Sequence, residues 1–138
     1  AVVVMDGKIV GEGLNRAEAK CDPTSHGEVD AIRDACAKLS VTSLKGADLY
    51  TSGEPCSMCV ATMYQVGIAR MFYAGAASDS ADFFGRLTEH DAKWTRSMSN
   101  QELREQVGLP IEQRSMPATQ MMVDDMVAVF KVFIDRNT

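Results

Sequence analysis

Three side chains that could bind a metal ion occur in two short motifs of this chain. His26 stands in His-Gly-Glu, and Cys56 and Cys59 stand in Pro-Cys-Ser-Met-Cys. Cysteines three positions apart share one face of the first turn of a helix, where the helix dipole stabilises thiolates. One imidazole and two thiolates favour zinc, and three protein ligands leave the fourth tetrahedral position open to water. The spacing therefore predicts one catalytic Zn²⁺ per chain, held by His26, Cys56 and Cys59.

Glu28 is the candidate catalytic acid and base. It follows His26 by two positions, so the two side chains leave a helix in different directions, and the carboxylate belongs beside a metal-bound water. Zinc can lower the pKa of such a water from 15.7 to about 7, and a carboxylate can then accept the proton and deliver it to a leaving nitrogen. These residues predict a hydrolysis that releases ammonia.

Both motifs open predicted helices of an alternating chain. Asp6-Gly7 lies between two apolar runs and predicts a hairpin of strands over residues 1–5 and 8–13. Apolar spacing and turn formers predict helices over 25–38, 55–67 and 121–133, and strands over 47–52 and 70–74. This alternation predicts an α/β sheet with right-handed crossovers. Residues 77–90 could form another helix, and residues 94–117 show no clear pattern.

His26-x-Glu28 together with Pro55-Cys56-x-x-Cys59 resembles the zinc-dependent cytidine deaminase superfamily, whose signature has these residue types. The resemblance covers residues 1–75. It implies a three-layer α/β/α sandwich around a mixed five-stranded sheet, with the zinc between the two ligand-bearing helices. It also implies a homodimer with exchanged C-terminal segments. The family's first helix has no counterpart before Ala1, so we expect the N-terminal segment of the family to be missing here.

Within the superfamily, residues 50–56 and 109–117 look most like bacterial guanine deaminases, which favours guanine or a related aminopurine as substrate. The match has three departures. Gly27 stands where most members have Ala, Gly53 stands where guanine deaminases usually have Cys, and their Gly-Phe-Asp-Asp motif is absent. Asp82 is the candidate to replace the missing carboxylate. The resemblance thus implies five substrate-binding residues: Asn15, Gly27, Gly53, Glu54 and Asp82.

Other interpretations remain open. The motifs overlap with those of tRNA-type adenosine deaminases, and Gly27 has a parallel in yeast-type cytosine deaminase. A zinc-stabilised binding module without turnover, or a redox Cys-x-x-Cys, would use the same residues. A structural zinc needs a fourth ligand, but the spare thiols Cys21 and Cys36 belong to no second metal-binding motif. Such a metal also has no need of the carboxylate of Glu28.

The composition of the chain indicates which kind of molecule it binds. Of 138 residues, 46% are apolar, and 14 basic against 19 acidic residues give a net charge of −5. This length predicts a single deaminase domain over residues 1–138. An acidic protein repels polyphosphates, so we expect a small-molecule amino-heterocycle rather than nucleic acid. No apolar run reaches the ~20 residues of a membrane span, and four cysteines without an export segment indicate a reducing, cytoplasmic setting.

Overall fold

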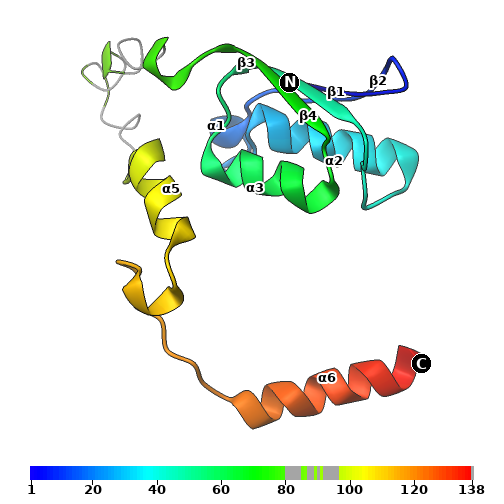
Figure 1. Ribbon diagram of the computed structural model, residues 1–138, viewed down its shortest axis with the longest axis vertical. Helices are drawn as coiled ribbons and strands as arrows, with labels where there is room; N and C mark the ends of the chain where they lie inside the picture. Colours follow the sequence, from blue (N-terminus) through cyan, green and yellow to red (C-terminus); the bar gives the residue numbers. More distant parts are fainter. Residues whose placement is uncertain (80–84, 87–88, 90, 92–96, 138) are drawn as a thin grey trace. The chain divides into compact units, whose positions relative to one another are not determined.

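A computed structural model describes residues 1–79, 85–86, 89, 91 and 97–137 of the chain (Figure 1). The chain divides into two compact units, Ala1–Asn100 and Gln101–Thr138. The single domain expected over residues 1–138 stays a prediction. Among the described residues, no helix is both long and apolar enough to cross a membrane.

The first unit is built on a mixed sheet with the strand order β2-β1-β3-β4. Strands β1 (Val2–Met5) and β2 (Lys8–Glu12) form an antiparallel hairpin. Strand β3 (Asp48–Gly53) pairs antiparallel with β1 and parallel with β4 (Arg70–Gly75). The predicted α/β class and mixed sheet are confirmed. The described residues form four strands where the resemblance implied five, because β4 has no neighbour on its outer side among them.

The predicted hairpin turn is confirmed by its backbone angles. Asp6 and Gly7 both have positive φ, 50° and 73°, as the two central residues of a type I′ turn require. This turn matches the twist of the flanking strands, so β1 and β2 leave it already paired.

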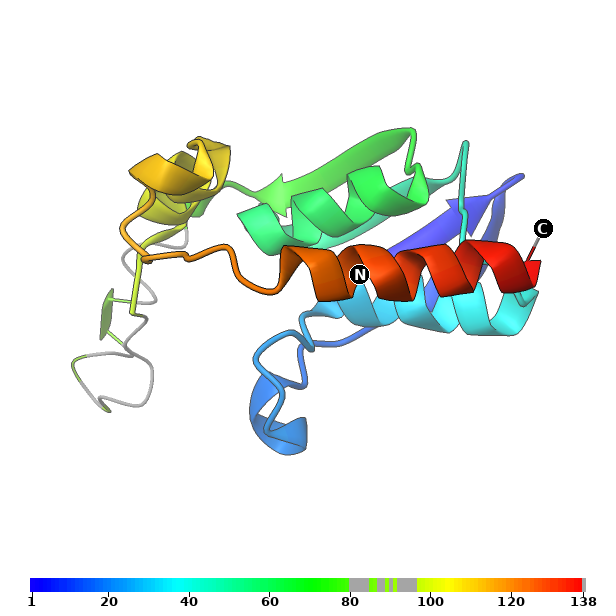
Figure 2. The ribbon, with the colours of Figure 1, turned by 90° about the horizontal axis from the view of Figure 1, so that it is seen from below.

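Two helices cover one face of this sheet (Figure 2). Helix α2 (Gly27–Leu39) packs on β1, β2 and β3, and α3 (Ser57–Val66) is the crossover between the parallel strands β3 and β4. Both agree with the predicted helices 25–38 and 55–67 to within two residues at each end. A short helix before them, α1 (Ala17–Lys20), was not predicted. Between the helices and the sheet lies the core: Val3, Val29, Ala31, Ile32, Ala35, Leu44, Ala47, Leu49, Cys56, Cys59 and Met63.

The opposite face of the sheet is open among the described residues of this unit. There the rings of Tyr50 and Phe72 stack with their centroids 4.6 Å apart, and both side chains are 41% exposed. The helices and the sheet therefore form two layers within the first unit. The second helix layer of the expected sandwich stays a prediction.

Two glycines allow α2 to lie close to the end of β2. A Cβ at Gly11 would collide with the carbonyl oxygen of Ala31 and with Ala35, and a Cβ at Gly13 would collide with backbone atoms of Gly27 and Ala31. Because these neighbours are mainly backbone atoms, they cannot move aside cheaply. The glycines therefore fix the depth at which the start of α2, with its predicted site residues, lies against the sheet.

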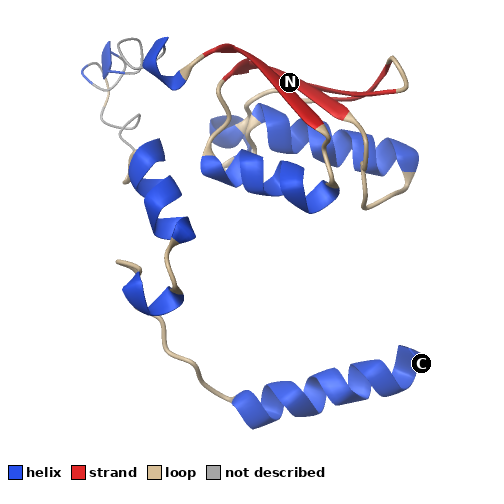
Figure 3. Cartoon of the chain, viewed as in Figure 1, coloured by secondary structure: helices blue, strands red, loops and turns tan. Residues whose placement is uncertain are grey.

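The second unit is helical (Figure 3). It contains α5 (Asn100–Gly108), which begins at the boundary between the units, a 3₁₀ turn η2 (Ile111–Gln113), and α6 (Val123–Asn137). The predicted helix over 121–133 is confirmed, and it continues to residue 137. Residues 94–117, which gave no pattern, include α5 and η2.

A buried carboxylate ties the loop before α2 to the helix itself. Asp30 is only 9% exposed. It accepts hydrogen bonds from Lys20 Nζ and Ser25 Oγ, both at 2.8 Å, and a longer one of 3.3 Å from Arg33. The hydrogen bond from Lys20, with those from Ser25 and Arg33, outweighs burial and holds the pKa of Asp30 below its ordinary value of 3.8. Since Ser25 directly precedes His26, the network fixes the chain where α2 begins.

This network predicts an acid-sensitive contribution to stability. A carboxyl whose folded-state pKa is lowered stabilises the fold above its ordinary pKa, and that stability is lost as the pH falls through the folded-state value. Asp30→Asn should therefore lower the free energy of unfolding by about 1–3 kcal/mol at pH 7 and flatten its decline below about pH 4. Urea unfolding between pH 2 and 7 measures both.

The matched control is Asp6→Asn. Asp6 is an exposed residue of the turn between β1 and β2, and asparagine tolerates the same positive φ. A wild-type pH profile for Asp30→Asn, or an equal loss for Asp6→Asn, would contradict the assignment.

Candidate metal centre

The predicted ligands come from the starts of the two helices on the covered face of the sheet. His26 is the N-cap residue of α2, with extended backbone angles, and Cys56 is the N-cap residue of α3. Cys59 lies in the first turn of α3 and is fully buried. The positive ends of both helix dipoles therefore meet at these three side chains, an environment that favours thiolates.

The three ligand atoms have the spacing that tetrahedral zinc requires. Cys56 Sγ lies 3.6 Å from both His26 Nδ1 and Cys59 Sγ, and Cys59 Sγ lies 3.5 Å from His26 Nδ1. Zinc bonds of 2.3 Å to sulfur and about 2.0–2.1 Å to nitrogen at tetrahedral angles give edges of about 3.8 Å between sulfurs and about 3.6 Å between sulfur and nitrogen. The donor set and its dimensions fit zinc, and His26, Cys56 and Cys59 form a candidate site for it.

The thiols of Cys56 and Cys59 differ in acidity. Hydrogen bonds from Cys59 and His26 lower the pKa of Cys56 from 9.0 to about 3 despite its burial. The pKa of Cys59 is raised, because its thiol donates to Cys56, is buried, and lies near the carboxylate of Glu28. One thiolate is thus already available, and a bound cation would remove the remaining proton, since a coordinating thiol is deprotonated.

Glu28 lies beside this cluster and outside the ligand set. It is the second residue of α2. Its Oε2 lies 3.5 Å from Cys59 Sγ, and its Oε1 accepts a hydrogen bond of 3.0 Å from Thr51 Oγ1 on β3. The carboxylate is therefore held at the edge of the site. We did not single out Thr51 from the sequence. Alternation along β3 places Thr51 on the same face as buried Leu49, but it does not indicate Glu28 as the partner.

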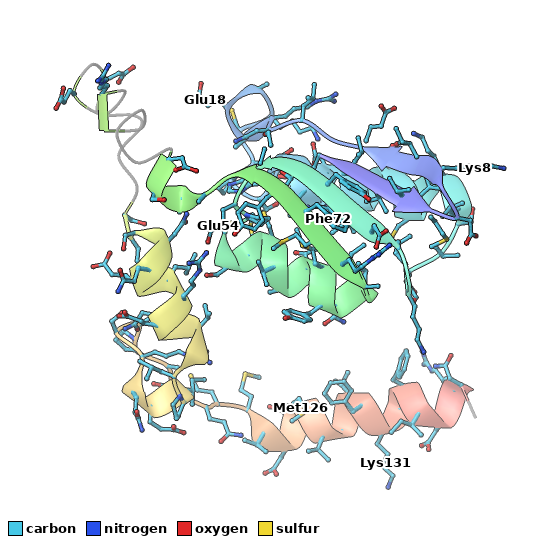
Figure 4. The ribbon with its side chains drawn as sticks, turned by 45° about the horizontal axis from the view of Figure 1, so that its top comes forward. Lys8, Glu18, Glu54, Phe72, Met126 and Lys131 are labelled. Atoms are coloured by element: carbon cyan, nitrogen blue, oxygen red, sulfur yellow. The ribbon has the colours of Figure 1, made fainter. Side chains whose placement is uncertain are left out.

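Two of the predicted substrate residues, Asn15 and Glu54, accept hydrogen bonds from nearby backbone N–H groups. Asn15 Oδ1 accepts the backbone N–H of Ala17 at 3.2 Å, and the backbone nitrogen of Asn15 lies beside Gly27. Glu54 lies in the connection from β3 to α3 (Figure 4), where its Oε2 accepts the N–H of Ala77 at 2.8 Å.

The space around Gly27 and Gly53 does not require glycine at either position. A Cβ at Gly27 would have only ordinary contacts, and one at Gly53 would meet no atom within 4 Å. Asp82 lies outside the described residues. The substrate roles of all five residues stay predictions.

Comparisons with known proteins agree with this centre. Residues 1–75 match the sequence family described as the cytidine and deoxycytidylate deaminase zinc-binding region. The chain is 32% identical over 133 residues to guanine deaminase of Bacillus subtilis (strain 168), an alignment covering 96% of this chain and 77% of that protein. The X-ray structure of guanine deaminase from B. subtilis is similar with a TM-score of 0.77, and the alignment covers 99% of this chain and 78% of that chain.

Two further similarities are shorter. A tRNA-specific adenosine deaminase of Agrobacterium fabrum is 39% identical over 98 residues, which are 67% of this chain and 64% of that protein. A crystal structure solved in complex with 2,6-diaminopurine is 25% identical, with a TM-score of 0.55 over 61% of this chain and 48% of that chain.

Removal of metal should destabilise the first unit. A ligand at about 1,000 times its Kd stabilises a fold by about 4 kcal/mol, so chelation should lower Tm by on the order of 10 °C. Purified protein should contain one zinc per chain, and Cys59→Ser should lose it. Elemental analysis and thermal unfolding with and without chelator measure these effects.

The control variant is Cys36→Ser, because Cys36 is a partly buried free thiol on α2 outside the cluster. It should keep both its zinc and its response to chelator. Zinc loss in Cys36→Ser, or full zinc content in Cys59→Ser, would contradict the ligand assignment.

Proposed function

Because this chain belongs to the family of the cytidine and deoxycytidylate deaminase zinc-binding region, we propose that it hydrolytically deaminates guanine or a related aminopurine. The observation that carries the proposal is the placement of the Glu28 carboxylate at the edge of the His26, Cys56 and Cys59 cluster. The purine assignment is supported by the 32% identity to a guanine deaminase, which extends over 96% of the chain.

Each residue of the site has its own role in the proposed reaction. Zinc, when bound, supplies a water activated for attack at neutral pH. Glu28 has one oxygen fixed by Thr51 and the other toward the cluster, so Oε2 is the atom that accepts a proton and passes it to the leaving amino nitrogen. His26, Cys56 and Cys59 would hold the metal as three protein ligands, the number typical of catalytic zinc.

The proposed reaction also requires that the substrate ring be oriented beside the metal site. We assign this orientation to Asn15, to the backbone amides near Gly27, and to those of Gly53 and Glu54, with Asp82 as the carboxylate that recognises the base. Backbone N–H groups at helix starts are suited to stabilise charge that develops on a purine oxygen or nitrogen.

Deamination of adenosine in tRNA is the second candidate. It is favoured by the 39% identity to a tRNA-specific adenosine deaminase, although this chain spans only 64% of that relative. A net charge of −5 disfavours it, because binding a polyphosphate requires compensating basic side chains. We therefore rank a free purine base first and tRNA second.

We further propose that the protein is a cytoplasmic homodimer in which C-terminal segments are exchanged. Nine of the fifteen residues of helix α6 are apolar, and the apolar face of an amphipathic helix packs against a partner surface. Its large apolar residues are Val123, Met126, Val127, Val129, Phe130, Val132, Phe133 and Ile134. The cytoplasmic assignment is supported by the four free cysteines, which persist in reducing compartments.

Glu28→Gln should abolish turnover while leaving the metal in place. The amide cannot take the proton, so kcat should fall by about 10²–10⁴-fold, with zinc content unchanged. Glu18→Gln is the matched control, since Glu18 is an exposed acid on α1 that points away from the sheet (Figure 4). Wild-type kcat in Glu28→Gln would contradict the assigned role.

A substrate panel separates the two candidates. Ammonia release from guanine should exceed that from adenine, cytosine, their nucleosides and tRNA by at least tenfold in kcat/KM. Turnover of tRNA alone, with affinity that falls steeply between 50 and 200 mM salt as phosphate contacts require, would reverse the ranking.

A further inference from the structure

Thr51 is the side chain that links the central sheet to Glu28. It lies on β3, which is flanked by β1 and β4 and is therefore an interior strand. Its hydroxyl donates a 3.0 Å hydrogen bond to Glu28 Oε1, across 23 positions of sequence. Among the described residues, the other close approach to this carboxylate is that of Cys59 Sγ, which lies 3.5 Å from Oε2.

The side chain of Thr51, which donates this hydrogen bond, is held more rigidly than the side chain of Glu28, which accepts it. Threonine is β-branched and therefore restricted at χ1, and the backbone of Thr51 is paired with Tyr73 of β4. A glutamate side chain has three rotatable bonds, and near the start of a helix it can turn toward solvent. A fixed hydroxyl on one carboxylate oxygen selects the rotamer in which the other oxygen faces the metal ligands.

We propose that Thr51 is a positioning residue for the deamination, acting through Glu28. The inference rests on the proposed function, because it concerns the proton transfer assigned to that carboxylate. The hydroxyl holds Oε1 so that Oε2 stays directed at the reacting groups. Thr51 itself transfers no proton and need not touch the substrate.

A positioning role has a kinetic signature that a packing role lacks. Orientation of the proton shuttle matters in the transition state, so its loss lowers kcat and leaves substrate binding nearly unchanged. Partners of this kind typically contribute about 10–100-fold. The effect must also follow the hydroxyl and not the size of the side chain, so threonine and serine should behave alike.

Four variants of the zinc-loaded protein test these expectations. Thr51→Val keeps the branched shape and removes the hydroxyl, and we expect kcat to fall about 10–100-fold with KM within about twofold. Thr51→Ala should give the same loss, and Thr51→Ser should recover most of the rate. Thr62→Val is the matched control, because the Thr62 hydroxyl bonds the carbonyl of Met58 within α3 and is not bonded to Glu28.

Thermal unfolding tests the contact between Thr51 and Glu28 without any measurement of activity. In the wild-type background Thr51→Val leaves Glu28 Oε1 without its donor, so Tm should fall by a few degrees. In a Glu28→Ala background the same substitution removes a hydroxyl that has already lost its acceptor, and Tm should not fall. If the Tm losses caused by Thr51→Val and Glu28→Ala were additive, the hydroxyl and the carboxylate would not interact.

The outcomes separate the two proposals. If wild-type protein deaminates none of the bases, the proposed function fails, and the thermal cycle still decides whether Thr51 holds Glu28. If wild-type protein is active, three results would overturn the inference: unchanged kcat in Thr51→Val, a rate in Thr51→Ser as low as in Thr51→Val, or an equal Tm loss in both backgrounds.

Discussion

The site depends on one geometric constraint, the convergence of two helix starts on one face of a sheet. His26 and Cys56 each cap a helix, and the atoms they offer lie 3.6 Å apart although 30 positions of sequence separate them. An error of one ångström in the placement of either helix would exceed what a tetrahedral zinc site tolerates. The close contacts of Gly11 and Gly13 with α2 set that placement on one side. On the other, β3 leads into α3 through a connection of three residues, 54–56.

Electrostatics explains why the centre needs both helix starts. Two thiolates and a carboxylate would gather three negative charges in a largely buried space, where like charges repel strongly. The positive helix ends reduce this cost, and a divalent cation with a neutral imidazole balances the two thiolates. Glu28 then remains as the charge outside the ligand set, and it has the Thr51 hydroxyl as a donor.

Much of this arrangement could be predicted from the sequence, because local patterns determine it. Asp6-Gly7 fixed the hairpin, and the motif around Cys56 placed the thiol pair in one helical turn. Side-chain partners distant in sequence could not be predicted. The Asp30 network and the contact of Thr51 with Glu28 depend on how α2 lies against other segments. Spacing within a motif carries no information about such contacts.

The most direct test of the central claim is a crystal structure with anomalous diffraction measured on both sides of the zinc absorption edge. We predict one peak, about 2.3 Å from Cys56 Sγ and Cys59 Sγ and about 2.0–2.1 Å from His26 Nδ1, with solvent in the fourth position beside Glu28. No peak at this place, or a fourth protein ligand that closes the tetrahedron, would contradict a catalytic zinc centre.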